Sequence, residues 1–362
     1  CVVAYAVGVR FAVMIPMHVP GASAEVLEVA RLVRTWADRE LLPGRSTLGE
    51  SIDGLLMPAL VVLREEVGLG EMLQAEGGIT GDAAEEPLVW ALCLLEVGRG
   101  DCGLGLLLTT ELALHQAGVR GDGQRVALAL ARLPRGDELG LPALGGRMPQ
   151  AVAREVGQGW RVSADQVKPL CSGLDADLLA VVCAAPGESE PLLALVSTDG
   201  AGVTVGEPIL QTGLAASRNA NFWLQDASAQ GVLPFGSGER GTLEAWLRLG
   251  LAGVCTGALE MGLQILTDWA EVRVIKGRGQ SFLDNPLVAG VMAEVAGDLM
   301  VSRALLVDAG RRFTLEGGRL GMGVACHRIS ALVERALGRA MELMGSAGYA
   351  REWQLERYWR DV

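Results

Sequence analysis

The spacing of apolar residues divides the chain into a helical first part, a β-like middle and a helical last part. Ser23 opens the first helical run at a capping-box-like position. The apolar residues after it repeat every three or four positions, as on one face of a helix: Val26, Val29, Ala30, Val33 and Ala37. Helical spacing then continues, with breaks at glycine and proline, to about Leu130. We expect one amphipathic helix from Ala22 and further helices over roughly 52–67, 87–99 and 105–117.

The pattern changes after Pro134, where turn residues cluster in PRGDELGLPALGG. Short β-like runs such as GWRVSAD and PLLALVS follow, separated by Gly, Asp, Pro and Ser, and helical spacing returns from Thr242 to the end. The predicted fold class is mainly α with a central β domain. It comprises an N-terminal α-helical domain over 1–134, a small antiparallel β-barrel or sheet domain over 135–238, and a C-terminal four-helix bundle over 239–362.

The composition supports long helices that pack closely. The chain has 362 residues, of which 50% are hydrophobic and only 4% aromatic, so that Leu, Ala, Val and Gly carry the apolar character. Its most apolar helical stretch, Leu249–Leu259, is bounded by Arg248 and Glu260 and is shorter than a membrane span of about 18 residues. We therefore expect no membrane span. The helix over 242–269 should be a core helix, with Gly253 at a close helix contact.

Charge and cysteine usage narrow the function classes. The net charge of −12 and the lack of a basic stripe exclude nucleic acid as a partner, although a few local arginines can still hold a small anion. Seven cysteines without a CxxC pair indicate buried thiols in a reducing cytoplasm. His18, His115 and His327 have no carboxylate or cysteine at ligand spacing, so no metal site is expected.

Segments spread along the chain resemble the acyl-CoA dehydrogenase family in their order. They include LLEVGRGDCGLGLLLTTELAL, LQTGLAASRNANFWLQDASAQ and RVIKGRGQSFLDNP, and MGSAGYAREWQLERYWRD is similar to the family's GGxGY…RYxRD signature. The resemblance covers roughly Ala22–Val362. It implies FAD, an acyl-CoA substrate, an electron-transfer flavoprotein as acceptor, and a homo- or hetero-oligomer. It also implies that a glutamate removes the α-proton while the β-hydride passes to the flavin.

The position of that glutamate is the weakest part of the resemblance. In much of the family it follows the RYxRD element, and this chain ends at Asp361–Val362. In another branch it precedes an arginine on the first bundle helix, which here is Arg248, a candidate substrate-binding residue, preceded by Leu247. Glu244 lies one helical turn earlier on about the same face and is the candidate catalytic base. The alternative for Glu244 is an ordinary glutamate near a helix start, favoured by the helix dipole.

The resemblance to the flavin site is uneven. At the family's GxKxWITN strand, Lys168 and Leu170 stand in place of the tryptophan and the threonine. At the nucleotide end, Arg273 matches the arginine that reaches a neighbouring subunit's FAD pyrophosphate, and Gly345 and Gly348 match glycines that approach the adenosine part. Arg273 could equally be a solvated helix end, and the two glycines a turn between helices.

Three hypotheses follow. The first is an active FAD-dependent acyl-CoA dehydrogenase. The second is a catalytically silent partner subunit in a hetero-oligomer, in which FAD is lost or shared with the partner. The third is a flavin-free scaffold whose cavity is filled by side chains.

Overall fold

The computed structural model describes residues 19, 22–42, 53–65, 67–68, 83–121, 123–130, 151–274, 277, 279–315 and 317–362. These residues form two compact units. The helical unit contains the described residues up to Gly105, together with Thr212–Ala216 and Arg248–Val362. The sheet unit contains those of Leu106–Gln211 and Ser217–Leu247. The segment 69–82, the stretch 131–150 and His18 lie outside the described residues.

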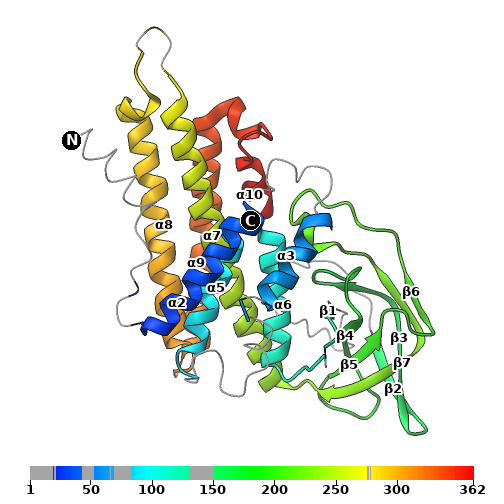
Figure 1. The fold of residues 1–362 in the computed structure, drawn as a ribbon. Helices are drawn as coiled ribbons and strands as arrows, with labels where there is room; N and C mark the ends of the chain where they lie inside the picture. Colours follow the sequence, from blue (N-terminus) through cyan, green and yellow to red (C-terminus); the bar gives the residue numbers. More distant parts are fainter. Residues whose placement is uncertain are drawn as a thin grey trace. The chain divides into compact units, whose positions relative to one another are not determined.

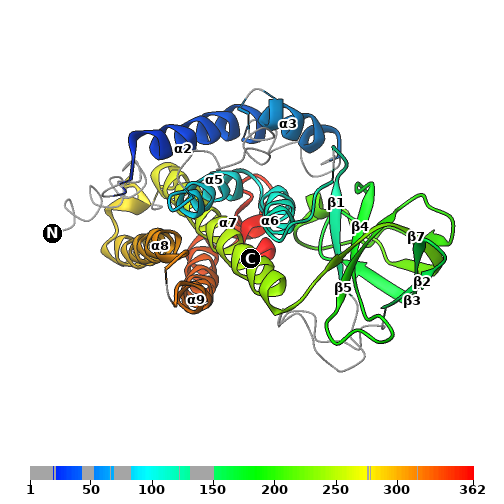
Figure 2. The same cartoon turned by 90° about the horizontal axis from the view of Figure 1, so that it is seen from below.

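The helical unit is built from two groups of helices separated in the sequence. The first group is α2 (Ala24–Trp36), the π-helical turn η1 (Ala37–Leu41), α3 (Asp53–Glu65), α5 (Glu86–Gly100) and the start of α6 (Cys102–Gln116). The second group is most of α7 (Ser237–Val272), η4 (Phe282–Asp284), α8 (Pro286–Arg312), α9 (Gly318–Met344), η5 (Gly345–Tyr349) and α10 (Leu355–Asp361). Figures 1 and 2 show α8 and α9 side by side, with α7 next to them.

The first helix begins where its sequence predicts. Ser23 is the N-cap of α2, and its Oγ accepts a hydrogen bond from the N–H of Val26 at 3.3 Å. The same hydroxyl donates to Glu85 at 2.8 Å, which ties the start of α2 to the residue before α5. The buried side chains of α2 then recur with helical spacing: Val26, Val29, Val33 and Trp36.

The helix α7 is the central apolar element. It is long and apolar enough to cross a membrane by length and composition alone, but 83% of its most apolar window is buried within the protein. Two of its glycines lie against α5: a Cβ on Gly253 would lie 2.8 Å from the carbonyl oxygen of Ala91, and a Cβ on Gly257 would lie 2.0 Å from that of Leu95. The two backbones therefore approach closely, as predicted for a core helix packed through small residues.

The sheet unit contains one seven-stranded sheet with the order β2-β3-β1-β4-β5-β7-β6. Its strands are β1 (Val126–Leu130), β2 (Ala151–Val156), β3 (Gly159–Pro169), β4 (Leu178–Cys183), β5 (Leu192–Ser197), β6 (Val203–Val205) and β7 (Phe222–Pro234), with the short 3₁₀ helix η3 (Ala215–Ser217) before β7. An additional pairing of β3 with β7 closes the central strands into a barrel, whose curvature is visible in Figure 2. Apolar side chains fill its interior, including Val162, Val181 and Phe222.

The predicted fold class is confirmed, but one element differs from the expectation. Helical spacing was predicted to continue to about Leu130, whereas Val126–Leu130 is strand β1. This strand pairs in parallel with β4, through Val126 with Leu178 and the residues that follow. A short apolar run such as VALAL fits a buried strand and a buried helix equally well, so its periodicity could not separate them. The sheet therefore begins before the expected boundary at 134.

Candidate functional site

The end of β3 carries Lys168 and Leu170, the two residues that the sequence analysis expected at flavin-lining positions. Lys168 is exposed and pairs with Leu130 of β1. The half-buried Leu170 follows, and its backbone N–H donates to the carbonyl of Leu128 at 2.8 Å. Leucine has no hydroxyl, and this N–H is already used within the sheet. Neither the side chain nor the backbone N–H of Leu170 can therefore donate a hydrogen bond to a ligand.

A tightly held turn continues from this strand. Ser172 has a positive φ of 53°, which is unusual for a residue with a side chain, and its N–H donates to the carbonyl of Ser217. The side-chain amide of Asn219 donates to the carbonyl of Pro169 at 2.6 Å. A Cβ on Gly173 would lie 2.9 Å from Oδ1 of the same asparagine, so the turn requires glycine there. The chain after β3 is thus fixed by the segment before β7.

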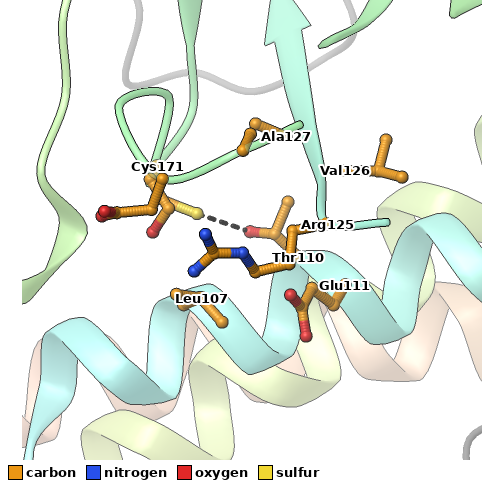
Figure 3. Close-up of a pocket in the computed structure, with 10 residues that line it drawn as sticks. Leu107, Thr110, Glu111, Arg125, Val126, Ala127 and Cys171 are labelled. Carbon is orange, nitrogen blue, oxygen red and sulfur yellow. Dashed lines mark hydrogen bonds between the residues drawn. The ribbon is translucent and has the colours of Figure 1, made fainter. Parts of the chain in front are cut away.

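A small pocket lies between this turn and α6 (Figure 3). The thiol of Cys171 points toward the hydroxyl of Thr110 and donates to it at 3.3 Å. Burial raises the pKa of Cys171 to about 11, so the thiol stays protonated and unreactive near neutral pH. The pocket has a volume of about 10 Å³, which is room for about one water molecule. It is far too small for a flavin ring.

The start of α7 carries the candidate base. Leu247, at the family's helix-base position, is fully buried, which suits a packing role. Glu244 and Arg248 are partly exposed, and each already interacts with other groups of the protein. Burial raises the pKa of the Cys326 thiol on α9, and the guanidinium of Arg248 opposes that rise. Arg248 therefore lies near α9 within the helical unit.

Arg273 lies at the exposed end of α7. Its backbone carbonyl accepts the N–H of Phe282 at 2.8 Å, and the ring of Phe282 packs edge to face against Trp269 with centroids 5.3 Å apart. These two contacts hold the end of α7 against η4. The guanidinium is exposed, and it makes no hydrogen bond or ion pair with the described residues.

The glycine turn η5 follows α9. Gly345 has a φ of +57° and a ψ of −130°, and among the residues that the structure describes, apart from its two chain neighbours, no atom lies within 4 Å of the position that a Cβ would take. Gly348 is buried, and a Cβ on it would lie 3.2 Å from the carbonyl oxygen and from the sulfur of Met341. The backbone of Gly345 is therefore open to a neighbouring group, whereas Gly348 is needed for packing against α9.

The helix α10 fixes the other side of this turn. The hydroxyl of Tyr358 lies 2.8 Å from the carbonyl oxygen of Arg99 and 3.2 Å from that of Gly100, to which it donates. Arg357 forms an ion pair with Asp101, a residue only 3% exposed, whose other oxygen accepts the N–H of Leu104 at 2.7 Å. The C-terminal signature thus docks on the junction of α5 and α6.

A cluster of buried charges in the helical unit was not predicted from the sequence. Glu96 of α5 and Glu260 of α7 are 4% and 3% exposed. Arg34 lies between them, with Nη1 at 3.3 Å from an oxygen of Glu96 and 3.1 Å from one of Glu260. Arg99 contacts Glu96 at 3.2 Å, and Arg303 contacts Glu260 at 2.5 Å. The sequence did contain a signal for this cluster: a single glutamate stands in each of the apolar runs LLEVG and ALEMG. A glutamate that is buried with its apolar neighbours is rarely without a charged partner.

The two buried carboxyl groups titrate differently. Burial, and then the charge of Glu260, raise the pKa of Glu96 to about 7, against the opposing effect of Arg34 and Arg99. Burial also acts to raise the pKa of Glu260, but Arg303 and Arg34 outweigh it, and the net pKa is lowered. Near neutral pH, Glu260 is therefore ionised while Glu96 is partly protonated.

The histidines give no metal site within the described residues. His115 is half-buried on α6, and burial and Arg120 lower its pKa. His327 is exposed on α9. Among the residues that the structure describes, no group of three or more His, Cys, Asp or Glu is placed to hold a metal ion. The described cysteines form no disulfide.

Helices before and after a central β-barrel domain, ending in a glycine turn and a docked RYxRD-like helix, define the acyl-CoA dehydrogenase fold. The structure of butyryl-CoA dehydrogenase from Megasphaera elsdenii is similar, with a TM-score of 0.77 and 17% identity over 94% of this chain and 93% of that one. Residues 243–362 match the family model described as "Acyl-CoA dehydrogenase, C-terminal domain". The chain belongs to the acyl-CoA dehydrogenase family.

Sequence and structural similarity to several acyl-CoA dehydrogenases supports this membership along the chain. The rat mitochondrial short-chain specific acyl-CoA dehydrogenase is 24% identical over 374 residues, which covers 96% of this chain and 88% of the relative. The (2S)-methylsuccinyl-CoA dehydrogenase of Cereibacter sphaeroides is 35% identical over 114 residues, or 29% of this chain and 18% of the relative. A glutaryl-CoA dehydrogenase from Mycobacterium smegmatis in complex with FADH2 shares the fold, with a TM-score of 0.74 and 17% identity over 94% of this chain and 89% of that one.

Family members bind FAD, and the residues described here fit that group at one end only. At the nucleotide end, Arg273 offers an exposed guanidinium and Gly345 an open backbone, both suited to phosphate and sugar groups. At the ring end, Leu170 provides no side-chain donor and no unused N–H. Other groups of the sheet unit would have to supply the hydrogen bonds to the flavin ring that Leu170 does not supply.

Proposed function

We propose that this chain is an acyl-CoA dehydrogenase-like flavoprotein that removes hydrogen from the α and β carbons of an acyl-CoA thioester. Family membership along nearly the whole chain supports the proposal. The observation that carries it is the η5 turn, where Gly345 leaves its backbone open and Arg357 and Tyr358 hold the following helix in place. A glycine backbone that is open on one side permits the close approach of a nucleotide.

The proposed roles follow from the chemistry of each group. Arg273 would bind the pyrophosphate of FAD on a neighbouring subunit, with Gly345 at the adenosine part. Gly348, which packs against α9, would hold the turn that presents Gly345. Bound FAD would supply the acceptor for the β-hydride. On the protein side, the carboxylate of Glu244 would take the α-proton, with Arg248 beside the thioester. An electron-transfer flavoprotein would then receive the electrons.

Assembly and location complete the proposal. The role of Arg273 requires a homo- or hetero-oligomer, because the residue acts on a neighbouring subunit. The free thiols of the described cysteines support a reducing compartment, the cytoplasm.

A second candidate is a catalytically silent partner subunit. Two observations favour it: Leu247 is fully buried at the helix-base position, and Leu170 leaves the ring end without a donor. Such a subunit would still present Arg273 to the flavin of an active partner. The flavin-free scaffold has no observation of its own in its favour.

The visible absorbance spectrum of the purified protein separates these candidates. An active dehydrogenase should show flavin bands, and anaerobic addition of its acyl-CoA substrate should bleach them. A protein that stays colourless with added FAD, and that no acyl-CoA in a chain-length panel affects, would contradict the main proposal. Flavin bound only after a second subunit is added would establish the silent-partner role.

Two variants and one matched control, each tested for its Kd for FAD, sharpen this experiment. Leu170→Thr restores a hydroxyl at the ring end and should lower the Kd for FAD, because a buried hydrogen bond to a ligand contributes about 1 kcal/mol, or roughly fivefold. Arg273→Ala should raise the Kd, whereas the matched change Arg328→Ala, at an exposed arginine of α9, should leave it unchanged. Equal effects of the two arginine variants would refute the role of Arg273.

A further inference from the structure

The helix α2 lies on the outside of the helical unit and packs against α5 (Figure 2). Both of its ends are anchored. At the start, the hydroxyl of Ser23 donates to Glu85, and at the end the indole N–H of Trp36 donates to the carbonyl of Ala59 at 3.1 Å. Only one face of α2 is buried, so the helix is a peripheral element held by that face and by its two ends.

The turn after α2 contacts the same neighbour. In η1, Asp38 is exposed and forms an ion pair with Arg99 of α5. Leu41 packs so closely on the end of α5 that a Cβ on Gly100 would lie 2.4 Å from its Cδ1. The helix and the turn therefore cover α5 as one continuous segment. This segment, residues 24–41, is called the lid here.

The buried charge cluster lies beneath the lid. The carboxyl groups of Glu96 and Glu260 are almost fully buried, and Arg34 of the lid contacts both of them. The side chain of Arg34 is 34% exposed, whereas those of Arg99 and Arg303 are 7% and 12% exposed. Among these arginines, the one from the lid is the one that reaches solvent. Displacement of the lid therefore removes the residue that lies between the two carboxyl groups and water.

The charges around Glu96 do not favour its ionisation while the lid is closed. Among the described residues, the titratable groups that face it, directly or through one partner, are Arg34 of α2, Asp38 of η1 through Arg99, Arg99 and Cys93 of α5, Glu260 of α7, and Arg303 of α8 through Glu260. Burial raises the pKa of the Cys93 thiol, which stays neutral. Ionisation of Glu96 therefore places a second carboxylate beside Glu260, away from water, and the two share Arg34.

We propose that residues 24–41 form a pH-sensitive lid, which opens more often as the pH rises because opening hydrates the ionised carboxylate of Glu96. The charge cluster has no part in the proposed reaction, so this inference goes beyond the proposed function and does not depend on flavin binding.

The direction of the effect follows from proton binding in the two forms. With the lid closed, the pKa of Glu96 is about 7. Opening removes burial, the largest cause of that rise, and returns the pKa toward 4.5, whereas the simultaneous loss of Arg34 is a smaller effect in the other direction. The closed form therefore binds the proton more tightly, and opening between about pH 4.5 and 7 releases it to water. The opening constant should rise through this window and level off above it.

Residue-resolved native-state hydrogen exchange of the full chain tests the proposal. Rates are measured between about pH 5 and 8 and corrected for the intrinsic rate at each pH, which leaves the opening constant. For the amides of Val29 and Val33 in α2, this constant should increase about tenfold or more across the range. Their opening free energy should also be lower, and less sensitive to urea, than that of Val333 in α9, because lid opening exposes less surface than unfolding.

Variants separate the charge from the lid itself. Glu96→Gln removes the titrating group, so the lid should open equally often at every pH. Glu28→Gln, at an exposed glutamate on the same helix, is the matched control and should keep the pH dependence. Ser23→Ala removes the N-cap of α2 without touching the charge cluster. It should raise the opening constant about fivefold at every pH and leave its pH dependence unchanged.

Three results would overturn the inference. The first is an opening constant for Val29 and Val33 that does not change with pH. The second is an opening free energy and urea sensitivity equal to those of Val333, which would show that the lid does not open separately from the rest of the helical unit. The third is an unchanged pH dependence in Glu96→Gln. If Glu96→Gln does not fold, Ser23→Ala decides, because unchanged lid opening in that variant would equally refute the proposal.

Discussion

The buried carboxyl group of Glu96 should make the stability of the protein depend on pH in a defined window. Its pKa is raised from an ordinary value of 4.5 to about 7, chiefly by burial. The folded state therefore binds this proton more tightly than the unfolded state does. The contribution to stability is fully present below about pH 4.5 and is lost as the pH rises through about 7.

The magnitude follows from the size of the shift. A rise of about 2.5 pKa units, at about 1.36 kcal/mol each, corresponds to about 3 kcal/mol. Glu96→Gln removes this titration while keeping the shape of the side chain. The variant should also lose part of the interaction with Arg34 and Arg99. This loss lowers its free energy of unfolding by an amount that does not change with pH. Between about pH 4.5 and 8 its free energy of unfolding should rise relative to the wild type by about 3 kcal/mol.

Urea denaturation at half-unit pH intervals measures this difference directly. Glu260 does not interfere, because its pKa is lowered and the stability linked to it is lost only as the pH falls below the window. Glu28→Gln is the matched control, since Glu28 is exposed and its pKa is lowered by Arg31. The reasoning is refuted if the stability profiles of wild type and Glu96→Gln run parallel from pH 4.5 to 8.

Two further predictions concern packing and buried charge. Gly253→Leu should destabilise the protein by about 1–3 kcal/mol or more, because a Cβ would already lie 2.8 Å from the carbonyl of Ala91, and a lowered Tm checks this. Gly290→Leu, at an exposed glycine of α8 with no atom of the described residues near its Cβ position beyond its own helix, is its control and should not lower the Tm. Arg357→Ala should cost about 3–5 kcal/mol in urea denaturation because it leaves Asp101 buried without its guanidinium, and a loss below about 1 kcal/mol would show that the pair is not needed.

The sequence by itself determined the order of the elements and the character of the main helix. Apolar residues repeating every three or four positions predicted the helices of the first and last parts, because this period places them on one face. Short β-like runs separated by turn residues predicted the strands of the middle. Ser23 was found as a cap since a local hydroxyl suffices to satisfy a helix start. The glycines of α7 indicated close packing before any partner was known.

The tertiary structure decided everything that depends on residues far apart in the chain. The VALAL run became strand β1 because β4 lies beside it, which no local pattern states. Glu96 and Glu260 share Arg34 only because α2, α5 and α7 meet, and their pKa values result from that shared burial. The contact of Asp361 with Leu214 joins positions 147 residues apart. Local propensity acts within a few residues, whereas burial and charge pairing act through space, so only the folded chain specifies them.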